Sequence, residues 1–189
     1  MKTIRMFLWL SSLTGLLYPL LITGIALLTM RQKAEGDFIE VNGNIVGAKQ
    51  IAQKFEDKKY FWGRPSYNDY SALPSQGSNL APIHLALKEL VEERRLKLQK
   101  EHLNSTTELP PELLFASASG LDPHISVTAA TFQMDRVAKA RRLEVKFIQN
   151  LIDRMKIQPF FGLFKEDYVN VLLLNLQLDE TENQIKKPI

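Results

Sequence analysis

The sequence of 189 residues contains no cysteine and only three histidines. The lack of cysteine excludes a disulfide framework and thiol chemistry, and it fits an oxidising and a reducing compartment equally well. The histidines, His84, His102 and His124, form no His-x-x-x-His pair, so we expect no metal site. Beyond the first six residues, 22 basic side chains face 21 acidic ones, a formal charge of +1. This balance excludes an electrostatic binder of nucleic acid.

Motifs of hydrolytic enzymes are missing as well. The sequence has no Gly-x-Ser-x-Gly elbow, no phosphate loop ending in Gly-Lys-Ser or Gly-Lys-Thr, and no Asp-Lys-Thr-Gly phosphorylation sequence. The chain therefore lacks the residues needed to hydrolyse ATP by itself.

Charged side chains are also absent from residues 7–30, where Leu, Ile, Phe, Trp and Tyr dominate. A helix rises about 1.5 Å per residue, so this segment reaches about 36 Å and crosses a hydrocarbon core about 30 Å thick. We predict a single transmembrane helix after a short tail of residues 1–6. A cleaved signal peptide is the alternative, because residues 24–26 read small-x-small, but the apolar run continues past that pattern.

The orientation of this helix follows from its flanks. Lys2 and Arg5 precede it and Arg31 and Lys33 follow it, so the positive-inside rule is nearly balanced. A short tail before the helix and a large domain after it favour a domain on the outer face.

Small side chains recur within the apolar segment. Ser11, Gly15 and Pro19 lie four residues apart, and this spacing predicts a helix face that a partner helix can approach closely.

The rest of the sequence predicts one mixed domain of the α/β or α+β class over residues 34–180, followed by a polar, poorly ordered tail of residues 181–189. The dipeptide Asn42-Gly43 favours a two-residue hairpin turn between short strands. Residues 67–82 are rich in Ser, Asn, Pro and Gly and predict a long loop. Hydrophobic spacing predicts the other elements. These are helices over residues 47–55, 83–103, 112–115 and 127–156, and a central strand over residues 168–176.

Four basic residues gather on the longest predicted helix: Arg136, Lys139, Arg141 and Arg142. Acidic residues stand close by in the sequence, so we interpret the cluster as a solvated helix face.

Residues 117–126 carry an acid and an imidazole, Asp122 and His124, in a string of turn formers. Pro123 forbids a helix through Asp122, and Ser126 precedes a helical pattern, which favours a loop followed by a helix cap. An acid/base pair is the alternative reading of the same two side chains.

A second loop has the composition of a phosphate site. Small residues at Ser75, Gly77, Ser78 and Asn79 would let backbone amides converge on an anion, although such strings also form plain turns.

Taken together, five ordered blocks behind one N-terminal anchor resemble the C subunit (KdpC) family of the Kdp-type potassium-transporting P-type ATPase. The match covers nearly the whole chain. The blocks are residues 60–65 (Tyr-Phe-Trp-Gly-Arg-Pro), 77–80 (Gly-Ser-Asn-Leu), 119–126 (Ser-Gly-Leu-Asp-Pro-His-Ile-Ser), Gln133 with 136–138 (Arg-Val-Ala), and 169–172 (Val-Asn-Val-Leu).

The resemblance implies a non-catalytic subunit that crosses the plasma membrane once, the inner membrane in a Gram-negative bacterium. Its partners would be a potassium-channel-like subunit, a P-type ATPase subunit and a very small hydrophobic subunit. The family is described as a catalytic chaperone that raises the ATP affinity of the ATP-hydrolysing subunit. A proposed nucleotide contact of the family, Ser-Gly-Gly-x, matches residues 75–78, where Gln76 replaces a glycine.

Two hypotheses follow from the resemblance. In the first, the domain lies outside and covers the channel-like subunit near the potassium entrance, with no nucleotide contact. In the second, Ser75, Gly77, Ser78 and Asn79 contact ATP alongside the ATPase subunit. In either case we expect His124 to face a partner subunit.

Overall fold

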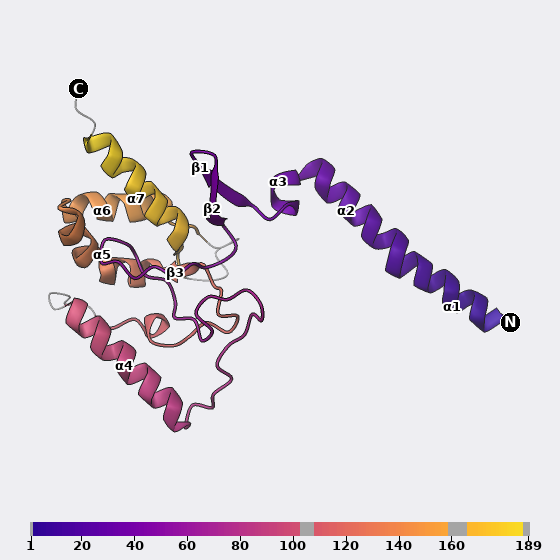
Figure 1. Ribbon diagram of the computed structural model, residues 1–189, viewed down its shortest axis with the longest axis horizontal. Coiled ribbons are helices and arrows are strands. Elements are labelled where there is room, and N and C mark those ends of the chain that lie inside the picture. Colours follow the sequence, from indigo (N-terminus) through magenta and orange to yellow (C-terminus); the bar gives the residue numbers. More distant parts are fainter. Residues whose placement is uncertain (1, 103–107, 159–165, 187–189) are drawn as a thin grey trace. The chain divides into compact units, whose positions relative to one another are not determined.

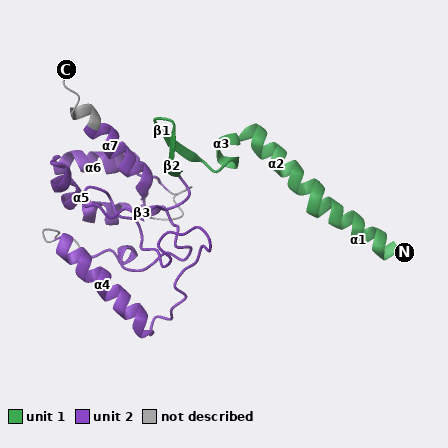
Figure 2. Ribbon diagram, in the orientation of Figure 1, with its two compact units in different colours: residues 1–48 green, residues 49–189 purple. Residues whose placement is uncertain are grey.

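The computed structural model describes residues 2–102, 108–158 and 166–186. The chain divides into two compact units, Met1–Ala48 and Lys49–Ile189, which are drawn in different colours in Figure 2. We describe each unit by itself.

The first unit begins with a helix that is long and apolar enough to cross a membrane, Lys2–Thr29. It consists of α1 (Lys2–Ser12), a π-helical turn η1 (Leu13–Leu17) and α2 (Tyr18–Thr29) (Figure 1). The wide turn has a local cause in Pro19, which has no N–H and whose ring would press on the carbonyl of Gly15 in a regular α-helix. The predicted apolar helix is confirmed, and it starts five residues earlier than expected.

A short helix α3 (Arg31–Ala34) and a hairpin complete this unit. Strands β1 (Phe38–Val41) and β2 (Asn44–Ala48) pair antiparallel around Asn42 and Gly43, whose φ angles are 53° and 78°. Both turn residues have the positive φ that a type I′ turn needs, so the predicted hairpin is confirmed. The helix predicted over residues 47–55 is wrong, because its first two residues belong to β2 and residues 49–55 form no helix.

The second unit is a mixed helical and stranded domain (Figure 1). Its two strands pair antiparallel, with Ile125 opposite Val169, and each strand leads directly into a helix. The core includes side chains at most 1% exposed, such as Phe61, Val137 and Ile152. The elements in order are α4 (Leu85–Glu101), a 3-10 turn η2 (Pro111–Leu113), β3 (His124–Ser126), α5 (Val127–Arg141), α6 (Val145–Met155), β4 (Tyr168–Asn170) and α7 (Val171–Lys186).

The predicted long loop over residues 67–82 is confirmed. The helix predicted over residues 83–103 is present as α4, in which Leu98 is the buried residue.

The single helix predicted over residues 127–156 is wrong. Arg142 adopts a left-handed φ of 59°, and the Leu143 amide donates to the Ala138 carbonyl at 3.0 Å, which ends α5. A straight helix of that length would extend about 45 Å, beyond the core of a small domain. The break lets Ile148 of α6 fold back into the core.

The strand predicted over residues 168–176 is also wrong after its third residue. The side-chain oxygen of Asn170 accepts a hydrogen bond from the Leu173 amide at 3.1 Å and caps α7. The apolar run then buries Val171, Leu174 and Leu178 at helical spacing. Because α7 continues to Lys186, the predicted tail of residues 181–189 begins as helix.

Candidate functional site

The loop predicted to hold a phosphate packs against the loop that contains Asp122. The Ser75 hydroxyl donates to the Ser119 carbonyl at 2.8 Å. A Cβ atom added to Gly77 would lie 2.6 Å from the Ala118 carbonyl oxygen, and one added to Gly120 would lie 2.8 Å from that of Gln76. Both glycines are therefore explained by the close approach of two backbones.

The other predicted phosphate contacts lie in the same segment. Asn79 has a left-handed φ of 51°, and Ser78 follows Gly77 directly. The nucleotide contact at these residues stays a prediction.

Asp122 and His124 are brought together. The Asp122 carboxylate accepts a hydrogen bond from the His124 amide at 3.0 Å, and the His124 Nδ1 atom lies 3.6 Å from it. Arg64 donates to the other carboxylate oxygen at 2.9 Å. Burial raises the pKa of Asp122, but hydrogen bonds from His124 and Arg64 outweigh burial and hold this pKa below its usual value. The group is a partly buried ion pair that joins residues 60–65 to residues 117–126.

The imidazole of His124 is one-third exposed, and its ring meets the Tyr168 ring edge-on at 4.9 Å between centroids. His124 therefore reaches the surface, although its predicted contact with a partner is untested.

The predicted helix cap is confirmed. The Ser126 hydroxyl accepts the Ala129 amide at 3.0 Å and donates to the Glu112 carboxylate, which also accepts the Ser126 amide at 3.1 Å. This arrangement fixes where α5 begins.

Sequence reasoning missed a set of amide side chains that hold residues 61–62. Gln133 accepts from the Trp62 amide at 2.8 Å and donates to its carbonyl at 3.0 Å. Asn175 does the same for Phe61, at 2.8 and 3.0 Å. Each side chain thus replaces a strand partner for one buried residue.

The structure corrects the prediction made for the basic cluster of Arg136, Lys139, Arg141 and Arg142. Arg136 and Arg141 are each only 6% exposed, so the predicted solvated face is wrong for both, whereas Lys139 and Arg142 are exposed as expected. Arg141 pairs with Asp179 at 2.7 Å. Buried guanidinium groups of this kind need hydrogen-bond acceptors, and the backbone around residue 60 supplies them.

Arg136 lies at the centre of the domain's polar interior. It donates to the carbonyls of Lys58 and of Tyr60, the latter at 2.9 Å, and to Gln133 at 2.7 Å. Its guanidinium stacks 3.9 Å from the centre of the Trp62 ring. The signal for this burial was present in the sequence, since Gln133 and Arg136 are three residues apart on the stripe that also carries Val137.

His102 completes the network. Arg136 donates to its Nε2 atom at 3.0 Å, so Nδ1 carries the proton and donates to the Leu98 carbonyl at 2.8 Å. Burial, opposed by this backbone hydrogen bond and aided by the charge of Arg136, lowers the pKa of His102 from 6.5 to about 4. The histidine is neutral at pH 7.

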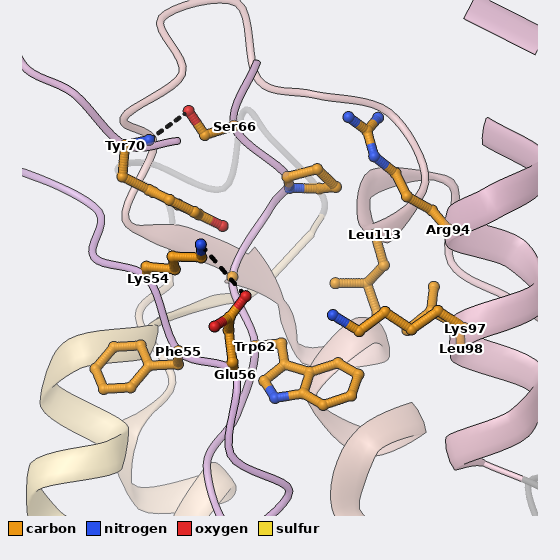
Figure 3. A pocket seen from close by; sticks show the side chains of 12 residues that line it. Lys54, Phe55, Glu56, Trp62, Ser66, Tyr70, Arg94, Lys97, Leu98 and Leu113 are labelled. Atoms are coloured by element: carbon orange, nitrogen blue, oxygen red, sulfur yellow. Dashed lines mark hydrogen bonds and ion pairs between the residues drawn. The ribbon is translucent and has the colours of Figure 1, made fainter. Parts of the chain in front are cut away.

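A pocket of about 200 Å³ opens between α4 and the segment of residues 54–70 (Figure 3). Trp62 and Tyr70 line it together with Arg94 and Lys97 of α4, and the Lys97 ammonium points toward the opposite wall. On the opposite wall Lys54 pairs with Glu56 at 3.3 Å and with Asp69, outside the lining, at 2.8 Å. This pocket could not be predicted from the sequence, because its wall combines segments far apart in the chain.

The predicted partner face of the apolar helix is uncovered within the first unit, as far as the structure describes it. Ser11 belongs to α1, Gly15 to the π turn and Pro19 to α2, and a Cβ atom added to Gly15 would meet nothing within 4 Å.

Comparison with known proteins assigns the chain to a family. The sequence profile described as KdpC, K+-transporting ATPase, c chain, matches residues 1–180. A relative from Herminiimonas arsenicoxydans, named potassium-transporting ATPase KdpC subunit, is 43% identical over 178 residues, which cover 93% of this chain and 94% of the relative. Proteins of the same name from Leptospira interrogans and Ralstonia nicotianae are also 43% identical, over 94% and 92% of this chain and 91% and 87% of their own lengths. The expected resemblance is thus confirmed, and the chain belongs to the KdpC family, the c chain of the K+-transporting ATPase.

Proposed function

We propose that this chain is a non-catalytic accessory subunit whose task is assembly of the potassium-transporting complex. It crosses the membrane once through Lys2–Thr29, and its domain lies on the outer face, where it covers the channel-like subunit near the potassium entrance. Its other partners are the P-type ATPase subunit and a very small hydrophobic subunit.

The observation that carries this proposal is the contrast in how the chain uses its side chains. No residue of the apolar helix is buried within its own unit, so its surface is available to lipid and to partner helices. In the domain, Asp122, Arg136 and His102 are engaged by neighbouring groups of the same chain. Asp122 and His102, which were considered as an acid/base group and as a metal ligand, thus hold the domain together with Arg136.

The proposal also has to account for the increase in ATP affinity that is described for the family. We propose that the effect acts through assembly of the complex, without contact between nucleotide and residues 75–79. The fit of Gly77 against the Ala118 carbonyl supports this view, because it explains the glycine without a phosphate. An outer-face domain would also stand across the bilayer from cytoplasmic ATP.

Substitution of Gln76, which is exposed, and of Ser78, whose hydroxyl accepts the Leu80 amide at 3.5 Å, tests this proposal in the assembled complex. Gln76→Ala with Ser78→Ala leaves Gly77 and its packing in place. We expect an unchanged dependence of ATP hydrolysis on ATP concentration, and no labelling of this chain by a photoreactive ATP analogue. Labelling of residues 75–79 that the double substitution abolishes would instead establish the nucleotide contact.

A co-purification experiment tests the assembly role. When the chain is absent, we expect the channel-like and ATPase subunits to separate during purification in detergent, and the full chain to restore the complex. Recovery of a complete, active complex without the chain would contradict the proposal.

A further inference from the structure

We propose that the pocket between α4 and residues 54–70 receives an aspartate or glutamate side chain from a partner subunit of the complex, held by Arg94 and Lys97. The proposal rests on membership in the complex, and it does not depend on which face of the membrane the domain occupies.

The charges of the pocket are unevenly paired. On one wall Lys54 is already neutralised by Glu56 and Asp69. Arg94 and Lys97 are three residues apart on α4, and neither has a carboxylate within 4.0 Å among the residues that the structure describes. Arg94 donates one hydrogen bond, to the Leu114 carbonyl at 2.8 Å. A guanidinium has five N–H donors, so it retains donors for a carboxylate.

The surroundings of these two cations favour a charged partner over water alone. Arg94 is half-buried, and this burial lowers the pKa of Arg94 from its ordinary value. The Lys97 ammonium stands 5.1 Å from the centre of the Trp62 ring, which holds it over the pocket (Figure 3). A carboxylate brought to this place restores the interactions that the half-buried Arg94 lacks, and it meets the exposed ammonium of Lys97 beside it.

The size of the pocket identifies the kind of occupant. Pockets for drug-sized ligands span roughly 300–1,000 Å³, and this one measures about 200 Å³. It is therefore smaller than a typical ligand pocket, and it suits one acidic side chain whose methylene groups lie against the indole of Trp62. The subunits of the complex can supply such a side chain on a surface loop.

Zero-length coupling with a carbodiimide tests this contact in the intact, purified complex, because it joins a lysine to a carboxylate only where the two touch. We expect a cross-link from Lys97 to an acidic residue of a partner subunit, identified by mass spectrometry. Lys97→Arg should abolish the cross-link and leave the complex intact, since arginine keeps the charge but does not couple. Lys88, an exposed lysine of the same helix, is the matched control and should couple at least fivefold less.

Charge reversal gives an independent readout. We expect the Lys97→Glu chain to leave the complex at a lower salt concentration, with about a tenfold weaker association of its domain, and Lys88→Glu to behave like the unaltered chain. Replacing the cross-linked partner carboxylate by lysine should restore the Lys97→Glu complex.

The proposal is overturned if Lys97 couples only to Glu56 of its own chain and Lys97→Glu resists salt like the unaltered chain. It is also overturned if ATP or inorganic phosphate protects Lys97 from coupling, which would assign the pocket to a small anion. Neither result depends on the orientation of the domain, which labelling from outside the cell decides separately.

Discussion

The helix Lys2–Thr29 and the domain from Lys49 onward satisfy their side chains in opposite ways. None of the helix residues is buried within its own unit. The domain takes strongly polar groups, including Arg136 and Gln133, into its interior and pairs them there. The environment of the helix therefore has to come from lipid or partner helices. The fold of the domain instead depends on packing and hydrogen bonds among its own residues.

The largest expected effect lies in the domain's polar interior. Arg136→Met keeps the approximate volume but removes the donors to Tyr60, Gln133 and His102. Unpaired buried acceptors cost about 1–3 kcal/mol each, so we expect the free energy of unfolding to fall by about 3 kcal/mol or more. Urea denaturation of the full chain in detergent measures it, followed by Trp62 fluorescence in a Trp9→Phe background.

Lys139→Met is the matched control, because Lys139 is an exposed cation on the same helix. We expect it to change the free energy of unfolding by less than about 0.5 kcal/mol. Equal effects of the two substitutions would show that the contrast between interior and surface cations on α5 is wrong.

A pH dependence of stability is the next effect in size. The pKa of His102 is about 4 in the folded domain and 6.5 as an ordinary value, so the unfolded chain binds more protons between these pH values. Stability from this group is thus fully present above pH 6.5 and is lost as the pH falls toward 4, by about 3 kcal/mol at most.

His102→Gln isolates this contribution, because glutamine keeps an acceptor for Arg136 but does not titrate. Carboxylates titrate in both proteins, so the difference between their unfolding free energies at pH 4.5 and pH 7 is the quantity to compare. If the difference in unfolding free energy between the unaltered chain and His102→Gln is the same at pH 4.5 and at pH 7, His102 is not buried in its neutral form.

The smallest expected effect concerns the apolar helix, and it is measurable only in the assembled complex. Gly15→Leu adds bulk to the face of Ser11, Gly15 and Pro19, so we expect about tenfold less co-purification with the pump subunits and no change in unfolding of the domain. Gly24→Leu is the control, because Gly24 lies in the same helix outside this spacing. If both substitutions assemble equally well, the small-residue face is not a partner contact.

The sequence predicted those features that depend on neighbouring residues. The Asn42-Gly43 turn, the Ser126 cap and the apolar helix all follow from local backbone geometry or from an uninterrupted apolar run. The resemblance carried the family assignment, because ordered blocks such as residues 60–65 do not depend on the class of each secondary element.

The failures arose where tertiary packing outweighed local pattern. Residues 171–176 read as a strand, yet they form a buried helix, because a continuous apolar run suits either element. Arg142, an ordinary helix former, turns the chain so that α6 can reach the core. Arg136 read as a surface cation because its acceptors, near residue 60, stand more than seventy positions away.

Residues predicted for function were partly brought together. Asp122 and His124 meet, with Arg64 as an unforeseen third member, whereas the pocket at Arg94 and Lys97 had no counterpart in the sequence reasoning. In the sequence, Arg94 and Lys97 resemble ordinary charged residues of an exposed helix face. Only the fold brings Trp62 close to them.

The orientation of the domain is the most direct test of the proposed function. The chain has no cysteine of its own, so Lys88→Cys in α4 and Lys2→Cys at the start of the membrane helix each provide one label site. A membrane-impermeant maleimide should label Lys88→Cys in intact cells and Lys2→Cys only after lysis. Labelling of Lys2→Cys in intact cells, with Lys88→Cys protected until lysis, would contradict the outer-face subunit.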